Sequence, residues 1–280
     1  MTDRAAGDAF ELAELEGGVT VLRVRPLETA LPGTVAVFST RRGGVSRPPW
    51  DTLNLGRHVG DSPADVAENR RRFCRAVGVE PETLVTAGQV HGDVVAVASS
   101  PGHHPDADGL VTLSPGLALA VFCADCVPVW LLDPVTPAAA VLHAGWRGSL
   151  AGIAARGVAT MVARLGGRAQ DILAAIGPSI GPCCYEVGPE VWEPAARFYG
   201  GEVVGRVLPD GKARLNLWEV NRKALAASGV LPANIYVAGL CTSCRADLFY
   251  SHRRAAGEAP SGPGGGREGR MAALIRLPVV

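Results

Sequence analysis

Two apolar runs with a turn between them constrain the fold of this chain more than any other feature. The first, LALAVFCADCVPVWLLDP, begins at Leu117, and the second, AAAVLHAGWRG, begins at Ala138. Short runs rich in Ala, Val and Leu that end at an Asp-Pro turn are typical of consecutive buried strands. Cys126 and His143 lie where the apolar residues give way to polar ones, so each is a potential metal ligand.

The remaining pattern predicts an α/β protein, α+β-like in character. Strands are expected from Val19 and from Thr34, and the last strand from Met271. Asp61-Ser62 followed by Pro63 predicts a helix that stops near Gly78. Further helices are expected at 150–167, 189–199 and 217–228. Because strands and helices alternate unevenly, we expect a single domain of mixed β-sheets flanked by helices.

The domain boundaries follow from the same pattern. Residues 1–18 are expected to form a loosely tethered lead-in, and residues 19–280 a single catalytic domain. The Gly/Pro-rich segment 255–269 is expected to be a mobile loop of unassigned role. It contains G-x-G-x-x-G from Gly264, which precedes a strand rather than a helix and therefore does not match a dinucleotide site.

Composition excludes several classes of function. Lys plus Arg equals Asp plus Glu, at 27 each, so no overall positive field attracts nucleic acid or an anionic membrane. The chain contains no apolar run of about eighteen residues that would span a bilayer. The first residues are acidic and polar, unlike a secretory signal. A cytoplasmic protein without nucleic-acid or membrane partners is therefore expected.

Seven cysteines in a long chain without a signal do not indicate a disulfide framework. Cys123 and Cys126 form a C-x-x-C without the helix start that a redox pair needs, so Cys123 is expected in the core. Cys241-x-x-Cys244 together with Cys123 and Cys126 would make a four-thiolate site, which excludes Cys126 from any other metal site. The adjacent Cys183-Cys184 suits a strained turn or core filling better than metal binding.

His91, Cys126 and His143 form the most informative set of potential ligands. They are separated by 35 and 17 residues, too far for a compact zinc finger. Ligands from the ends of different strands are typical of an open, catalytic metal site. Spacing alone leaves open the alternative of two hydrogen-bonded histidines and one buried thiol.

A series of motifs resembles a known family. From about Thr40 to Arg270, the motifs occur in one consistent order: STRRGGVS, NLG, ENR, QVHG, ADG, ADC followed by Val-Pro, HAGWRG, IGPSI, YEVG, FYSHRR and GR. The series resembles the YfiH family, also called the laccase-domain, polyphenol-oxidase-like or peptidoglycan-editing-factor family. The resemblance implies that His91, Cys126 and His143 hold a zinc ion and act in catalysis, with copper possible at the same ligands.

The resemblance also implies candidate activities. The family is described as purine nucleoside phosphorylases that split adenosine, inosine and methylthioadenosine with phosphate, with adenosine deaminase activity, and in older descriptions as copper-dependent polyphenol oxidases. Copper clusters are rich in histidine. The chain has six histidines and no His-x-His pair, which disfavours the oxidase.

Phosphorolysis requires a bound phosphate and a purine nucleoside. Arginines in the matched motifs are expected to bind the phosphate: Arg42, Arg147, Arg253 and Arg254. Deamination requires a carboxylate that moves a proton, and Asp125 and Glu186 are both candidates. The resemblance, together with these residues, therefore implies a zinc-dependent purine nucleoside phosphorylase with adenosine deaminase side activity.

Two other functions remain as alternatives. A hydrolase or amidase that edits peptidoglycan precursors would use the Cys126 thiolate as its nucleophile with a histidine base. A metal-stabilised interaction protein would hold the ion without turning over a substrate. The sequence does not determine the oligomeric state.

Overall fold

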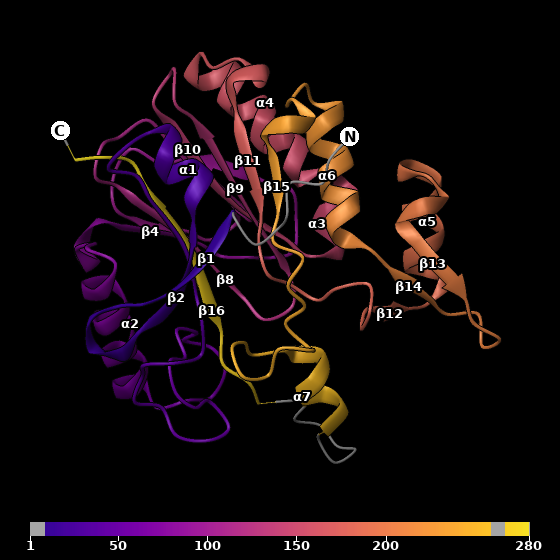
Figure 1. Cartoon of the computed structure of the whole chain (residues 1–280), viewed down its shortest axis with the longest axis horizontal. Helices are drawn as coiled ribbons and strands as arrows, with labels where there is room; N and C mark the ends of the chain where they lie inside the picture. Colours follow the sequence, from indigo (N-terminus) through magenta and orange to yellow (C-terminus); the bar gives the residue numbers. More distant parts are fainter. Residues whose placement is uncertain (1–8, 259–266, 280) are drawn as a thin grey trace.

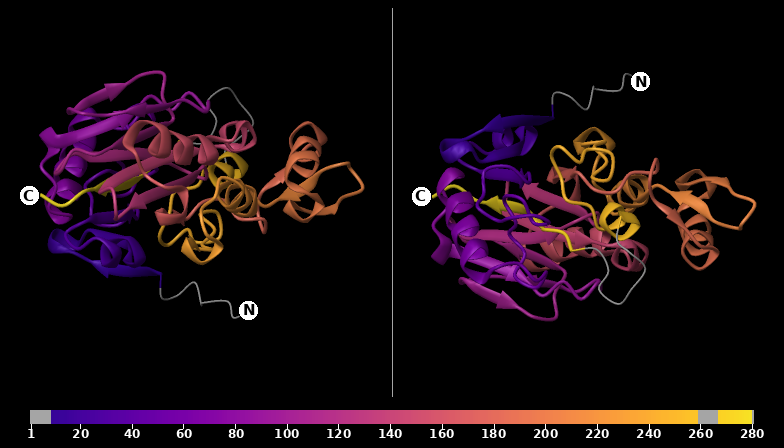
Figure 2. Two further views of the ribbon diagram at one scale, coloured as in Figure 1. Left: turned by 90° about the horizontal axis from the view of Figure 1, so that it is seen from above. Right: turned by 90° about the horizontal axis from the view of Figure 1, so that it is seen from below.

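The described part of the chain comprises residues 9–258 and 267–279 of a computed structural model. Its main body stacks two large β-sheets face to face, with helices on the outer face of each sheet (Figure 1). A small third sheet and one helix project from one side of this body (Figure 2). The predicted fold class, mixed sheets flanked by helices, is confirmed.

The seven-stranded sheet has the order β1-β2-β3-β16-β8-β4-β6. Its strands pair antiparallel except for the parallel pairs of β4 with β8 and with β6. The last strand of the chain, β16, therefore lies between β3 and β8. The strand bounds are β1 Phe10–Glu14, β2 Thr20–Val24, β3 Val35–Ser39, β16 Met271–Arg276, β8 Ala118–Cys123, β4 Leu84–Ala87 and β6 Gly102–His104.

The six-stranded sheet has the order β15-β11-β9-β10-β7-β5, and β12-β14-β13 form the small sheet. In the six-stranded sheet β15 and β5 pair parallel with their neighbours, and the inner strands pair antiparallel. The bounds are β15 Ile235–Val237, β11 Leu173–Ile176, β9 Val127–Asp133, β10 Ala138–Ala144, β7 Gly109–Thr112, β5 Val95–Val97, β12 Glu186–Val187, β14 Ala213–Leu215 and β13 Val204–Val207.

Two of the described helices, α2 and α6, begin at a side chain that caps them. Ser62 accepts a hydrogen bond from the amide of Asp65 (3.3 Å) ahead of Pro63, as predicted, and Asn216 caps α6 in the same way. The helix bounds are α1 Arg25–Ala30, α2 Pro63–Ala76, α3 Trp146–Ala151, α4 Ile153–Leu165, α5 Pro189–Tyr199, α6 Leu217–Ala227 and α7 His252–Glu258. No helix among the described residues is both long and apolar enough to cross a bilayer.

Alternation along β10 sorts its side chains between two cores. Ala139 and Val141 pack between the two large sheets, whereas Ala140 and Leu142 pack under α4 and α6. The two sheets are joined by a buried hydrogen bond from Nε1 of Trp130 to the carbonyl of Leu274 (3.1 Å). Since His143 follows Val141 at period two, this alternation directs His143 between the sheets at the end of its strand.

The first apolar run forms two strands in different sheets instead of one. It is divided into β8 in the seven-stranded sheet and β9 in the six-stranded sheet, so the chain crosses between the sheets at residues 124–126. Asp125 makes this crossing with a left-handed backbone, φ 86°. The predicted Cys126 therefore lies at the junction of the two sheets.

Three further expectations differ from the structure. Phe10–Glu14, inside the expected lead-in, forms β1, which pairs with β2 and buries Phe10. The apolar segments LVTAGQVHG and VVAVA, on either side of Gly92-Asp93, predict a pair of neighbouring strands, but they form β4 and β5, which belong to different sheets. Residues 255–258 of the expected loop belong to α7, and residues 259–266, with the first half of the G-x-G-x-x-G, lie outside the described residues.

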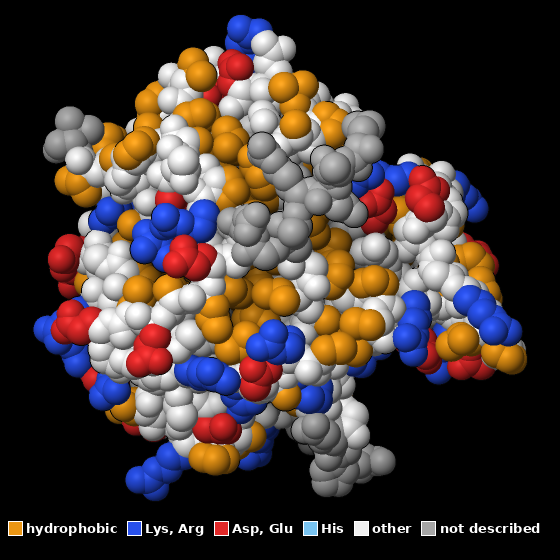
Figure 3. Space-filling model, in the orientation of Figure 1, with side chains coloured by type: hydrophobic (Ala, Val, Ile, Leu, Met, Phe, Trp, Pro, Cys, Tyr) orange, Lys and Arg blue, Asp and Glu red, His pale blue; other side chains and the backbone are white. Residues whose placement is uncertain are grey.

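The face of the molecule in Figure 3 carries positive and negative side chains side by side, with apolar side chains between them. This mixture agrees with the equal numbers of acidic and basic residues in the sequence.

Candidate metal centre and adjoining pocket

His91, Cys126 and His143 come together at one end of the stacked sheets. Their ligand atoms all lie within 4.8 Å of one another, and Sγ of Cys126 is 3.9 Å from Nε2 of His91. The two imidazole rings are nearly perpendicular, with centroids 5.0 Å apart. His91 follows β4, Cys126 precedes β9 and His143 lies near the end of β10. Three strand ends thus place two nitrogens and one sulfur around a common point.

Asp108 holds two of these residues in place. Its carboxylate contacts Nδ1 of His143 at 2.8 Å and accepts hydrogen bonds from the amides of His91 (3.0 Å) and Gly92 (2.8 Å). Burial acts to raise the pKa of Asp108, but these hydrogen bonds outweigh burial and lower the pKa overall. The ionised carboxylate accepts the Nδ1 proton of His143, which leaves Nε2 free to bind a metal.

Backbone strain is concentrated at this centre. Gln89, His91 and Asp125 are the three described non-glycine residues with positive φ, at 61°, 64° and 86°. A left-handed backbone at such residues costs on the order of 1–3 kcal/mol each. Gln89 offsets part of this cost with two side-chain hydrogen bonds to the backbone of Phe122, at 2.6 and 2.8 Å. Strain at these positions is typical of a functional site.

Asp125 lies next to Cys126 and is fixed from three directions. Its side chain accepts hydrogen bonds from the hydroxyls of Thr242 (2.6 Å) and Ser251 (3.0 Å) and from the amide of Arg253 (2.7 Å). These contacts join the crossing between the sheets to the loop before α7 and to the first turn of α7. The carboxylate of Asp125 is thus committed to positioning the backbone beside Cys126.

Gly145 leaves room for the three ligands. A Cβ at this position would lie 2.9 Å from Cδ2 of His91 and 3.4 Å from Sγ of Cys126. The first distance is too short for ordinary contact, so a side chain here would displace the His91 ring. Gly145 therefore permits the close approach of the turn before α3 to the ligands.

The electrostatics favour the form of Cys126 that binds metals. Burial acts to raise the pKa of Cys126, but the charge of His143 and hydrogen bonds from both histidines lower it to about 6. Burial likewise acts to lower the pKa of His143, whereas Cys126 and Asp108 raise it to about 9. The pair therefore favours a thiolate beside a positive charge, and a bound cation supplies that charge equally well.

A pocket of about 820 Å³ opens beside the three ligands, all of which contribute to its wall. This volume lies in the range of small-molecule sites. None of the described residues that line it is an Asp or a Glu. The other basic and imidazole side chains on its wall are Arg57, Arg70, Arg270, His58, His103 and His252. The pocket is therefore suited to an anionic ligand.

The charge on the pocket wall is incompletely neutralised. Burial and the positive charge of Arg57 lower the pKa of Arg70 to about 10. Neither arginine forms an ion pair with a carboxylate within the described residues. Arg270 does contact Glu268 at 2.6 Å, and the same carboxylate oxygen lies 3.0 Å from Nδ1 of His252. This contact with Glu268 raises the pKa of His252 and orients its ring at the pocket.

The four arginines expected to bind phosphate lie outside the wall of this pocket. Arg42 donates to the carbonyl of Asp247, and Arg254 donates to the carbonyls of Thr242, Ser243 and Phe249. Their guanidinium groups therefore support the loops that surround the site.

Arg147 and Arg253 are more closely associated with the ligands. The guanidinium of Arg147 lies over the Trp146 ring, and that of Arg253 lies over the ring of Tyr185. Burial and then Cys126 raise the pKa of Tyr185, whereas Arg253 and Arg147 act to lower it. The charges of Cys126 and of both arginines thus act on the pKa of Tyr185.

Of the two candidate carboxylates, Asp125 is hydrogen-bonded as described, and Glu186 lies 3.4 Å from Nζ of Lys212. Residues that the sequence analysis missed lie within the matched motifs: Arg70 in ENR, Asp108 in ADG, His252 in FYSHRR and Arg270 in GR. Their position in these motifs was the available signal.

The cysteines divide differently from the sequence expectation. Cys123 is buried in the core between the sheets, as predicted. Cys241 and Cys244 lie with Cys183 and Cys184, and not with Cys123 and Cys126. The proposed conflict over Cys126 therefore does not arise. Cys183 and Cys184 lie in a turn at 182–184, as expected, but they also belong to a group of four thiols that could hold a metal ion, which was not expected.

Comparison with known proteins agrees with this geometry. Residues 35–278 match the family model described as multi-copper polyphenol oxidoreductase laccase. A protein of Geobacillus stearothermophilus named purine nucleoside phosphorylase YlmD is 39% identical over 255 residues, which cover 87% of this chain and 90% of the relative. A purine nucleoside phosphorylase of Deinococcus radiodurans is 42% identical over 242 residues, covering 86% and 88%.

Solved structures are similar over nearly the whole chain. The crystal structure of YlmD from Geobacillus stearothermophilus has a TM-score of 0.86 at 36% identity and covers 96% of this chain and 99% of its own. That of the Bacillus licheniformis protein YfiH has a TM-score of 0.85 at 34% identity and covers 97% and 100%. The chain belongs to the laccase-like family of YfiH and YlmD.

Proposed function

We propose that this chain is a zinc-dependent purine nucleoside phosphorylase that splits adenosine, inosine or methylthioadenosine with phosphate. The observation that carries the proposal is a centre of two imidazoles and one thiol that opens into a pocket with basic and no acidic lining among the described residues. The names of the relatives support the same activity. The reaction yields a free purine base and a pentose 1-phosphate.

The residues present fit a zinc ion. Zinc prefers imidazole nitrogen and thiolate sulfur, and its catalytic sites have three protein ligands. His91, Cys126 and His143 offer this set, and Asp108 fixes the ring orientation of His143. When bound, the ion supplies a positive charge and Lewis acidity at the wall of the pocket. Copper is a possible occupant of the same ligands.

The basic wall of the pocket supports phosphate binding. Arg57 and Arg70 have no carboxylate partner among the described residues, so an anion placed between them relieves their mutual repulsion. Arg147 and Arg253, beside Tyr185, are the proposed second set of phosphate contacts. Arg42 and Arg254 are proposed to act through the loops to which they donate.

His252 is the proposed proton donor to the purine. As a phosphate oxygen forms its bond to C1′, the bond from C1′ to the base breaks and its electron pair goes to the purine. A protonated imidazole on the wall neutralises that charge. His252 is suited to this role because Glu268 orients it and raises its pKa.

The activity is tested by chromatography of nucleosides incubated with the protein, with and without phosphate. We expect inosine to yield hypoxanthine and ribose 1-phosphate only when phosphate is present. The Cys126→Ala variant should lose this turnover together with the bound metal, while its circular dichroism spectrum stays unchanged. Full activity of Cys126→Ala on inosine plus phosphate would contradict the proposed mechanism.

The phosphate contacts are tested separately. Arg57→Ala should raise the KM for phosphate about tenfold, as expected for loss of a charged hydrogen bond, with a smaller change in kcat. Arg75→Ala, an exposed arginine on α2, is the matched control. If the KM for phosphate is unchanged in Arg57→Ala and Arg70→Ala but raised in Arg147→Ala, the phosphate binds instead at Arg147, near Tyr185.

The role of His252 predicts a pH dependence. Activity should fall on the alkaline side as His252 loses its proton, and the contact with Glu268 holds this limb above the usual histidine range. Glu268→Gln removes the charge that raises the pKa, so the alkaline limb should move to lower pH. If the alkaline limb of the pH profile does not move in Glu268→Gln, a group other than His252 donates the proton.

Adenosine deamination is proposed as a side activity only. Asp125 is held by three hydrogen bonds and Glu186 is paired with Lys212, so neither is poised to move a proton. Slow conversion of adenosine to inosine without phosphate would support the side activity. Loss of that conversion in Glu186→Gln, with phosphorolysis intact, would assign the proton transfer to Glu186.

One observation favours a second candidate, a Cys-dependent hydrolase or amidase. The pKa of Cys126 is lowered to about 6 beside His143, as in an activated nucleophile. In that case the metal-free protein should remain active, and alkylation of Cys126 should abolish its activity. The phosphorylase should instead lose activity on chelation and regain it with zinc.

The proposed compartment is the cytoplasm. All seven cysteines are free thiols in the structure, and a reducing compartment preserves them.

A further inference from the structure

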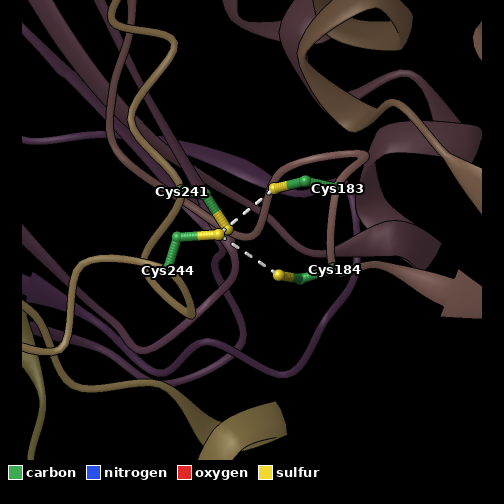
Figure 4. A group of neighbouring side chains, drawn as sticks. All are labelled: Cys183, Cys184, Cys241 and Cys244. Atoms are coloured by element: carbon green, nitrogen blue, oxygen red, sulfur yellow. Dashed lines mark hydrogen bonds between the residues drawn. The ribbon is translucent and has the colours of Figure 1, made fainter.

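We propose that Cys183, Cys184, Cys241 and Cys244 form a second metal site, a closed tetrathiolate that takes zinc and stabilises the loops beside the first centre. The four sulfur atoms lie within 4.8 Å of one another, and the side chains point toward a common centre (Figure 4). They come from two loops, one between β11 and β12 and the other between β15 and α7.

The spacing of the sulfur atoms fits a metal better than a disulfide. Tetrahedral zinc with Zn–S bonds of about 2.3 Å places its sulfur ligands about 3.8 Å apart. Sγ of Cys244 lies 3.5 Å from that of Cys183 and 3.4 Å from that of Cys184. A disulfide requires about 2.05 Å between the sulfurs, and all four residues are free thiols.

The backbone around the cluster is arranged for a buried thiolate. The amide of Gly181 donates to Sγ of Cys241 at 3.3 Å, as expected where a sulfur carries negative charge. A Cβ at Gly181 would lie 2.6 Å from the Trp218 ring and 3.2 Å from Cβ of Cys241, so only glycine lets this amide approach. Cys241 is buried, whereas Cys183 and Cys244 are exposed, which gives an ion a path to the site.

The cluster is connected to the first centre through the loop between Cys241 and Cys244. Thr242 lies inside this C-x-x-C and donates its hydroxyl to Asp125, which precedes Cys126. The same loop is joined to the other one by hydrogen bonds from the amide of Thr242 to Ser179 and from the amide of Ser179 to Leu240. An ion held by both loops therefore stabilises the position of Asp125.

The number and type of ligands indicate a structural role. Four thiolates complete the tetrahedral coordination of zinc and leave no position for a substrate. The cluster also lies outside the wall of the pocket, as the lining residues include none of its cysteines. The second site is therefore proposed to hold its ion permanently and to contribute to folding.

The test is metal content per chain. The protein is purified without oxygen, reconstituted with zinc and desalted, and zinc is then measured by mass spectrometry. We expect two ions per chain in the wild type and one in Cys241→Ser/Cys244→Ser. Cys126→Ala should also retain one, so failure of the first centre is distinguishable from failure of the second. Cys74→Ala, a buried cysteine outside both groups, is the control and should retain two.

A second variant keeps the test decisive if the first does not fold. Cys183→Ser/Cys184→Ser removes two ligands from the other loop and should also reduce the content to one. In protein loaded with cobalt, Cys126→Ala should keep the intense sulfur-to-metal charge-transfer absorption of a tetrathiolate. The proposal is overturned if the wild type holds one ion that Cys126→Ala removes, or if its intact mass shows a disulfide within the cluster.

Discussion

The two groups of potential ligands differ in how much of a metal's coordination they complete. The first offers three ligands of two kinds and borders a pocket, whereas the second offers four thiols and lies away from it. Three protein ligands leave a position for chemistry, and four satisfy the ion. Under the two proposals, the same chain uses cysteine ligands for reactivity at the first group and for stability at the second.

The surroundings of the two groups differ in the same sense. The first is surrounded by strained backbone and by carboxylates that orient its residues, such as Asp108 and Asp125. In the second group the sulfur atoms contact one another, and the amide of Gly181 donates a hydrogen bond to Cys241. Substitutions near the first group are therefore expected to change metal affinity and turnover. Substitutions at the hydrogen bond between Thr242 and Asp125, which joins the two groups, are expected to change stability.

The largest effect is expected for Asp108→Asn. An amide has one acceptor oxygen, so it cannot accept the hydrogen bonds of His143, His91 and Gly92 together, and metal affinity at the first centre should fall by about 10–100-fold. Competition with a chelator measures this change. Asp106→Asn, an exposed neighbour in the same loop, is the control. Equal metal affinities in the two variants would show that Asp108 does not support metal binding at the first centre.

A smaller effect is expected for Gly145→Ala. The added methyl lies against His91 and Cys126, and overpacking of this kind costs about 1–3 kcal/mol. Metal affinity at the first centre should therefore fall about tenfold, while the four-cysteine group keeps its ion. Gly201→Ala places a methyl in open space and should change neither quantity. Loss of metal from both groups in Gly145→Ala would show that they do not act separately.

The smallest effect on metal binding is expected for Thr242→Val. This isosteric change removes the hydrogen bond to Asp125 and should lower the free energy of unfolding by about 1–3 kcal/mol. Urea unfolding measures it, and Thr160→Val, whose hydroxyl bonds only within α4, is the matched control. Metal affinity at either site should change less than threefold. A larger change in metal affinity would show that the hydrogen bond between Thr242 and Asp125 affects metal binding as well as stability.

Several features were predictable because they depend on local pattern. The short apolar runs on either side of an Asp-Pro turn predicted buried strands, and they set His143 near the end of the second run. Ser62 and Pro63 marked the start of α2 because the helix needs a cap and tolerates proline there. His91, Cys126 and His143 were selected by the matched motifs, and the structure brings their ligand atoms within 4.8 Å of one another.

Other features depend on which loops meet, and no local pattern encodes this. Cys183 and Cys184 lie about sixty residues from Cys241 and Cys244 in the sequence. The two pairs come into contact because their loops follow β11 and β15, which are parallel neighbours and end at the same edge of the sheet. Likewise Arg57, Arg70 and Arg270 share a pocket wall because β16 inserts between β3 and β8. An arginine in a matched motif looks the same whether it supports a loop or faces a ligand.

The sequence by itself determined the fold class, the buried character of the two apolar runs and the three residues of the first centre, since apolar runs, caps and short motifs each involve only a few neighbouring residues. The tertiary structure decided the division of the first apolar run between two sheets, the partners of Asp108 and Asp125, and the meeting of the four cysteines. These depend on sheet order, which is set by the combined packing of strands distant in the chain.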